Sequence, residues 1–266
     1  MKRGDISESN KRGQVTVFII AAILIIGLAV LIYFLKPGIT VTTGFDEKTP
    51  NGFIQTCIED EIESAVDLVS LQGGSINPEN FILYQDNKIE YLCYTSEYYK
   101  TGSIQQPFLK EHIESEIKDN IKDEVTNCFN ELRSNYESRA YVVNLQPGET
   151  TVELLPKRVV TRFDYVLTLT KTSTERYETF NVVLNNNLYE LVSIANSIVD
   201  WESELGDSET TLYMSYYKDL KVEKANQVDG STIYILTDRN TGNKFQFASR
   251  SVAWPPGYGV DEVVTN

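Results

Sequence analysis

Three cysteines and one histidine are the side chains of this chain best suited to bind a metal or to act in covalent catalysis. The cysteines Cys57, Cys93 and Cys128 lie 36 and 35 residues apart, whereas structural zinc sites draw their ligands from closely spaced pairs. An oxidising compartment would instead allow one disulfide and leave one free thiol. We therefore expect no metal site and no cofactor.

A catalytic triad or a Cys–His pair would depend on His112, the single histidine. It lies between Glu111 and Ile113 in a charged stretch with helical spacing, as expected for an ordinary, partly exposed histidine. The sequence contains neither a Walker A motif nor a Rossmann glycine pattern. Acidic residues are numerous, so a carboxylate-based hydrolase stays as a third hypothesis, without a defined acid pair. We predict that the protein is not an enzyme and has no small-molecule substrate.

Two further patterns have both a structural and a functional interpretation. Residues 238–243 partly resemble a calcium-binding loop, but Ser249 stands where such a loop has glutamate, so a hairpin turn is expected. The tyrosine pairs at 98–99 and 216–217 would suit an adhesive surface. Packing of these rings inside a sheet is the favoured interpretation.

The elements that must position these residues follow a long apolar stretch. Val15 to Leu35 is uncharged, and its 21 residues would form a helix of roughly 31 Å, about the thickness of the hydrocarbon core of a bilayer. A cleaved signal peptide would have a shorter apolar core followed by a small-x-small site. Four basic residues lie within 1–14, so the positive-inside rule places this tail in the cytoplasm and residues 37–266 outside.

The part after the apolar stretch is strongly acidic. The chain has a formal net charge of −14. Residues 1–36 carry five basic and two acidic side chains, so the remaining part has a charge of −17. Such a surface repels phosphate backbones, which makes nucleic acid an unsuitable partner. The expected partners are membrane lipid, through the apolar stretch, and other membrane or surface proteins or further copies of the chain.

Beyond a linker at 36–50, the residue pattern predicts an α+β fold in two successive parts. Residues 51–136 are expected to form a helix–hairpin–helix part, and residues 137–254 a β-rich part with one or two helices, followed by a tail at 255–266. The predicted helices span 52–72, 107–134 and 188–204. The predicted strands lie at 81–84, 88–95, 142–145, 152–155, 159–170, 177–184, 233–237 and 244–248, while 212–217 is ambiguous.

One disulfide is expected between the first two of these helices. Cys57 lies beside the apolar stripe of the first helix, and Cys128 lies in the stripe of the second. The intervening hairpin can fold the two helices antiparallel, which would bring both sulfurs within bonding distance. Cys93, in the hairpin strand, would then be a buried free thiol. Three reduced cysteines, or a pairing that includes Cys93, are the alternatives.

Two resemblances bear on the class of protein. Lys11-Arg12-Gly13-Gln14, directly before the apolar stretch, resembles the cleavage site of archaeal type IV prepilins, which are cut after the glycine and assemble through the helix that follows. Phe18 stands where bacterial pilins typically have glutamate, so the match is to the archaeal pattern.

The second resemblance covers most of the chain. Cys57, Leu71-Gln72-Gly73-Gly74, Gln106-Pro107-Phe108-Leu109, Cys128 and Arg250-Ser251-Val252-Ala253-Trp254-Pro255-Pro256 together resemble uncharacterised membrane-anchored surface proteins of small-genome archaea. That resemblance implies a cell-surface location and no particular mechanism.

The favoured hypothesis is a single-pass, membrane-anchored extracytoplasmic protein with a structural or interaction role at the cell surface. The alternative is a pilin-like filament subunit that is cleaved between Gly13 and Gln14.

Overall fold

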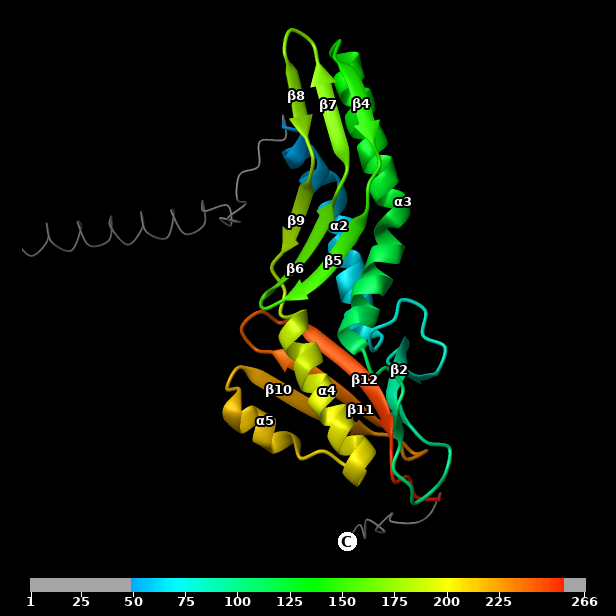
Figure 1. Ribbon diagram of the computed structural model, residues 1–266. Helices are drawn as coiled ribbons and strands as arrows, with labels where there is room; N and C mark the ends of the chain where they lie inside the picture. The colour runs from blue at the N-terminus through cyan, green and yellow to red at the C-terminus, as the bar shows by residue number, and fades with distance from the viewer. Residues whose placement is uncertain (1–48, 256–266) are drawn as a thin grey trace, which may run out of the picture. The chain divides into compact units, whose positions relative to one another are not determined.

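The computed structural model describes residues 49–255, which have an α+β fold (Figure 1). The sequence predicted an α+β fold headed by a single transmembrane helix. The α+β class is confirmed for residues 49–255, but the predicted fold as a whole, with its membrane-spanning helix, is not the one that they show. No helix within residues 49–255 is long and apolar enough to cross a membrane. The longest, with 30 residues, is amphipathic and carries charges along its outer face. The predicted span at 15–35 and the predicted cleavage site at Gly13 and Gln14 lie outside the described residues.

Helices α2 (Pro50–Leu71) and α3 (Leu109–Ser138) form an antiparallel pair (Figure 1). Thr49 begins α2, because its hydroxyl oxygen accepts a hydrogen bond from the Gly52 amide at 3.1 Å. Each helix buries a stripe of isoleucine, valine and leucine against the other and against the sheets. Both helices lie where the apolar periodicity predicted them, within a few residues at each end.

The largest sheet combines strands from both ends of the described chain. Its order is β1-β2-β12-β11-β10, with the short β3 beside β2. The pairing of β2 with β12 is parallel, whereas the other pairs are antiparallel. The strands are β1 (Phe81–Tyr84), β2 (Asn87–Tyr94), β3 (Ser103–Ile104), β10 (Leu220–Asn226), β11 (Thr232–Asp238) and β12 (Lys244–Arg250). The predicted hairpins β1–β2 and β11–β12 are present. The sequence pattern did not predict strand β10, nor the pairing of β2 with β12 that joins the two hairpins in one sheet.

The remaining six strands form two three-stranded sheets with the orders β4-β7-β8 and β5-β6-β9. Together they form a meander of three long segments, which are β4 with β5, β6 with β7, and β8 with β9. Each segment is interrupted at the same level, where Gly148 approaches Asp164. A Cβ atom on Gly148 would lie 1.8 Å from the Asp164 carbonyl oxygen, so only glycine fits there. The predicted single strand at 159–170 is therefore two strands. The strands are β4 (Val142–Gln146), β5 (Thr150–Leu155), β6 (Arg158–Phe163), β7 (Val166–Thr170), β8 (Thr174–Tyr177) and β9 (Phe180–Leu184).

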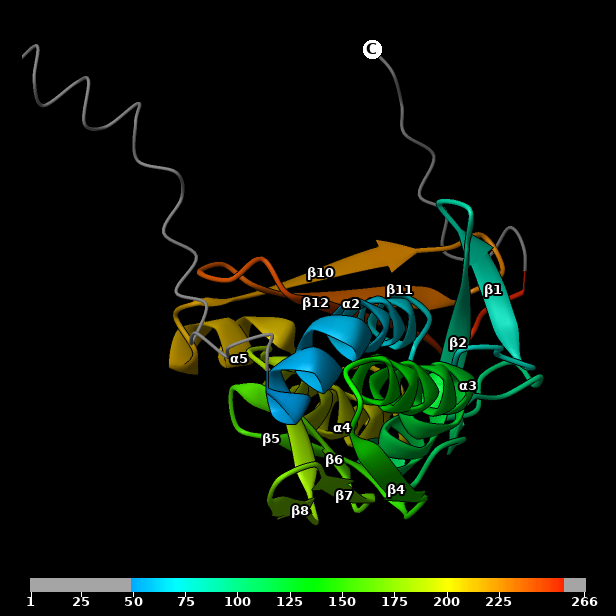
Figure 2. The same cartoon turned by 90° about the horizontal axis from the view of Figure 1, so that it is seen from above.

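One hydrophobic core joins these layers. Helix α2 contacts both β9 of the meander and β12 of the large sheet, and α3 packs on β5 and β4 (Figure 2). In this core the Phe129 ring of α3 stacks on Tyr165 with the ring centroids 4.0 Å apart, and it meets Phe180 edge to face at 5.1 Å. The two predicted parts, 51–136 and 137–254, therefore share their core.

Two further helices follow the meander. Helix α4 (Leu188–Leu205) packs on the large sheet, and α5 (Thr210–Tyr216) packs on β10. Gly206 ends α4 with a left-handed φ of +84°, and a Cβ atom there would lie 2.0 Å from a methyl group of Val252. The ambiguous segment at 212–217 is thus largely a short helix.

Candidate functional site

The candidate site is a groove between α4 and α5. One face of α4 is buried, and the opposite face carries Ser193, Ser197, Trp201 and Leu205 at intervals of four residues. This spacing places the four side chains along one line of the helix. Helix α5 and the following residues 217–219 form the facing wall.

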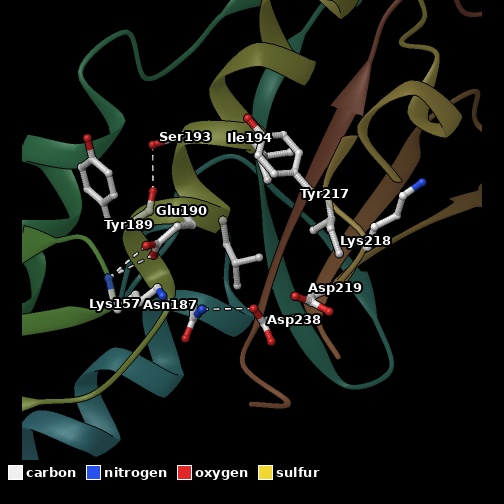
Figure 3. A pocket seen from close by; sticks show the side chains of 12 residues that line it. Lys157, Asn187, Tyr189, Glu190, Ser193, Ile194, Tyr217, Lys218, Asp219 and Asp238 are labelled. Carbon is white, nitrogen blue, oxygen red and sulfur yellow. Dashed lines mark hydrogen bonds between the residues drawn. The ribbon is translucent and has the colours of Figure 1, made fainter. Parts of the chain in front are cut away.

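The first cavity of the groove has a volume of about 400 Å³ (Figure 3). Side chains from α4 lie on one side of it, and Tyr217, Lys218 and Asp219 lie on the other. Two of its carboxylates already accept hydrogen bonds from the protein. Glu190 accepts from the Lys157 amide at 3.0 Å, and Asp238 accepts from the Asn187 side-chain amide at 3.0 Å.

Asp219 is the carboxylate of this cavity that is open to a ligand. It is exposed, and its side chain has no hydrogen bond or ion pair within residues 49–255. In Figure 3 the Lys218 ammonium points away from Asp219 and Asp238. Asp219 forms none of the salt bridges found among residues 49–255, so its charge is available to a ligand.

The second cavity, of about 720 Å³, is larger and more apolar. Both cavities fall in the size range of ordinary ligand pockets, which is about 300–1,000 Å³. Tyr217 lines both of them, so the two cavities are neighbours, and together they are called the groove. Across the groove, the Ser197 and Tyr213 hydroxyl groups form a hydrogen bond of 2.7 Å between α4 and α5. The remaining apolar lining comes from Trp201, Leu205, Leu212 and Tyr216.

Large apolar side chains of this cavity are unusually exposed. The exposed fraction is 48% for Trp201, 58% for Leu212 and 82% for Tyr216. Exposed large apolar side chains that line one cavity make it the candidate binding site of the described residues. The sequence-based interpretation that Tyr216 and Tyr217 pack inside a sheet is wrong, because α5 is a surface helix and its short length cannot cover its own rings.

The second tyrosine pair is also on the surface. Tyr98 and Tyr99 are exposed, although Tyr99 meets Trp254 edge to face with ring centroids 5.1 Å apart. Arg250 lies over the Tyr98 ring at 5.4 Å. These rings therefore form a second, smaller aromatic surface, and packing inside a sheet is wrong for them too.

The polar end of the larger cavity is acidic. Asp207 and Glu209 line it together with Ser208. The Ser208 hydroxyl is buried and has no hydrogen-bond partner among the described residues. A buried polar group without a partner costs about 1–3 kcal/mol.

A buried polar cluster fixes α4 beneath the groove. The Tyr234 hydroxyl donates to one carboxylate oxygen of Glu202, and the Ser249 hydroxyl donates to the other at 2.7 Å. Burial raises the pKa of Glu202 above the ordinary glutamate value. Cys93 also lies in this region, where burial raises its thiol pKa to about 11. A thiol with such a pKa is a poor nucleophile, so we assign the cluster a structural role.

His112 lies in a second polar cluster at the start of α3. Its Nε2 atom is 2.8 Å from the Ser75 hydroxyl, which also donates to the buried Glu90. Burial raises the pKa of Glu90. In a catalytic triad the histidine stands between the serine and the carboxylate. Here the serine stands between the other two, so the cluster does not have that arrangement.

The structure contains the predicted disulfide. The Sγ atoms of Cys57 and Cys128 are bonded at 1.99 Å, with the Cα atoms 5.9 Å apart, and Cys93 is free and buried. A carboxylate oxygen of Glu124 and the two sulfur atoms lie within 4.8 Å of one another. Because the sulfurs are bonded to each other, this group cannot act as a metal-ligand set while the disulfide is intact.

The residues 238–243 form the hairpin turn that the sequence favoured. One Asp238 carboxylate oxygen accepts hydrogen bonds from the Asn240 and Thr241 amides at 2.9 Å and 3.0 Å, and Gly242 has a φ of +79°. The carboxylate thus closes the turn between β11 and β12. Its other oxygen is the one that holds Asn187.

Comparisons with known proteins give no indication of function, so function is inferred from the geometry of the described residues. No protein-family model, no curated protein and no solved structure matches this chain. The resemblances to archaeal surface proteins and to prepilins therefore stay predictions.

Proposed function

We propose that this protein is an extracytoplasmic interaction protein that holds a partner in the α4–α5 groove. The observation that carries the proposal is the exposure of Trp201, Leu212 and Tyr216 around the larger cavity. Aromatic side chains are enriched at protein interfaces because they contribute a large contact area with few rotatable bonds.

The Cys57–Cys128 disulfide supports a location outside the cytoplasm, because cytosolic reductants keep most thiols reduced. The test is to block free thiols in the intact cells that make the protein, and then to map its peptides without reduction. A linked pair containing Cys57 and Cys128 is expected. Three blocked thiols would overturn the proposed location.

The groove itself is tested in the same cells with the full chain. A photo-crosslinking residue replaces Leu212 in one variant and Val228 in a control variant, since Val228 is 96% exposed and does not line the groove. A defined crosslinked partner is expected at position 212 and not at position 228. Equal crosslinking at both positions, or none at 212, would overturn the role of the groove.

A filament subunit is the second candidate, and the sequence Lys11-Arg12-Gly13-Gln14 favours it. Mass spectrometry of the protein from the producing cells separates the two candidates. An N-terminus at Gln14 supports the filament subunit, whereas an intact Met1 or Lys2 excludes processing at that site. Hydrolysis of surface glycans by the purified chain would favour the third hypothesis, a carboxylate-based hydrolase.

A further inference from the structure

We infer that the α4–α5 groove binds a cationic amphipathic helix of a partner protein. This inference rests on the proposed function and specifies the chemistry of the partner. Three features of the groove carry it, which are its exposed carboxylates, its apolar lining and the positions of its two cavities along α4.

The carboxylates of the groove select for positive charge. Asp207, Glu209 and Asp219 line its two cavities as exposed carboxylates. Asp207 is bridged by Lys224 at 2.5 Å, whereas Asp219 has no partner among the described residues. Lys218 also lines the smaller cavity but points away from Asp219 (Figure 3), so a negatively charged partner would be repelled at Asp219. A second copy of this acidic chain is therefore a poor occupant.

The larger cavity suits the side chain of lysine or arginine as well as an apolar residue. Trp201, Leu205 and Leu212 in its lining can cover a methylene stem, and the exposed carboxylates of Asp207 and Glu209, which also line it, can meet a charged head. Trp201 and Tyr216 are also partners for a cation–π contact. A sugar ring would use the aromatic faces but would leave the aliphatic part of the lining uncovered.

The two cavities follow one another along α4, as a helical partner lying beside α4 would require. Ser193 lines the smaller cavity and Trp201 lines the larger one. These residues are eight positions apart on α4, which corresponds to roughly 12 Å. A partner helix that lies along the groove would place side chains seven or eight positions apart into the two cavities. Peptide grooves of this type are read by anchors at such helical intervals.

The test uses the full chain in neutral detergent with Trp254 replaced by phenylalanine. The chain has two tryptophans, so Trp201 in the groove becomes the only fluorescent indole. The probes are a 15-residue helical peptide with leucines on one face and lysines elsewhere, and a twin with glutamate in place of each lysine. We expect the lysine peptide, and not its twin, to shift the Trp201 emission to the blue.

Variants show whether that shift reports on the groove. Leu212→Asp is expected to weaken binding at least tenfold, Asp219→Lys about 2–5-fold, and Val228→Asp not at all. An equal response to both peptides, or a response that persists in Leu212→Asp, would overturn the inference. Concentration-dependent self-association that abolishes the response would assign the groove to a second copy instead.

The peptide-binding test and the crosslinking test at position 212 can fail independently of each other. A crosslink at position 212 in cells, without binding of the lysine peptide, would reject the cationic helix and retain the interaction groove. Absence of both would reject the groove as a binding site.

Discussion

The region around Phe129 and the region around Trp201 use the same kinds of side chain in opposite ways. Phe129, Phe163 and Phe180 pack against one another between α3 and the meander, and each is almost completely buried. Trp201 and Tyr216, between α4 and α5, keep about half or more of their surface exposed. The composition of the two regions is alike, but only the first is closed by surrounding elements.

The difference follows from what covers each helix. Helix α3 has 30 residues, faces α2 along its length and is tied to it by the disulfide. Helix α5 has seven residues and packs on the edge strand β10. A helix of two turns cannot bury its own aromatic rings, so they stay available to a partner. The comparison suggests that the Phe129 region stabilises the fold and that the α4–α5 region binds.

The largest effect on stability is expected from Phe129→Ala. Removing a buried phenylalanine costs about 3–5 kcal/mol, because its contacts are lost and a cavity remains. Urea denaturation of the full chain measures the change, with Tyr216→Ala as the matched control. The exposed control should change the free energy of unfolding by less than about 0.5 kcal/mol. Equal losses in both variants would contradict the proposed contrast.

Loss of the disulfide is the next largest effect. Replacing Cys57 and Cys128 by serine opens a loop with a sequence separation of 71 residues. Such a crosslink typically contributes about 2–4 kcal/mol, mainly through the unfolded chain. Denaturation of the double variant is compared with the Cys93→Ser variant, which keeps the bridge. The double variant should also keep its affinity for a groove ligand, since the bridge joins α2 and α3 only.

A smaller and pH-dependent effect is expected from Glu202→Gln. The raised pKa of Glu202 means that the folded state holds a proton that the unfolded state releases. Stability is therefore greatest below the ordinary glutamate pKa and falls as the pH rises through the raised value. The buried Glu90 contributes in the same direction.

Glutamine at position 202 can still accept from Tyr234 and can donate to Ser249, but it does not titrate. As the pH rises from 4 to 8 the natural chain should lose more stability than the Glu202→Gln variant, because only the natural chain has to deprotonate this buried carboxyl group. Glu204→Gln, on the exposed side of the same helix, is the control. A pH dependence that is unchanged in Glu202→Gln would contradict the assignment.

The smallest effect on stability is expected in the groove. Leu212→Asp replaces an exposed leucine that lines the larger cavity. Its free energy of unfolding should stay within about 0.5 kcal/mol of the natural chain, while crosslinking to the partner from a neighbouring groove position is lost. A strongly destabilised Leu212→Asp variant would instead place this leucine in the core and remove the contrast between the two regions.

Local patterns in the sequence determined most of the elements. The apolar stripes of α2, α3 and α4 and the turn at 238–243 were predicted because helical periodicity and turn chemistry depend on neighbouring residues. The Cys57–Cys128 bridge was also predictable, since each cysteine lies on or beside a stripe that must face the other helix. The location of residues 1–48 relative to a membrane was likewise argued from local composition, and it stays a prediction.

Tertiary structure alone decided which elements meet. Nothing local in β2 indicates that it pairs in parallel with β12, more than 150 residues later. The same holds for the groove, because the sequence pattern of Tyr216 and Tyr217 is equally compatible with a buried strand. Whether a ring is covered depends on the packing of α4, α5 and β10 around it. That packing is a property of long-range contacts, whereas periodicity reports only on the nearest turns of the chain.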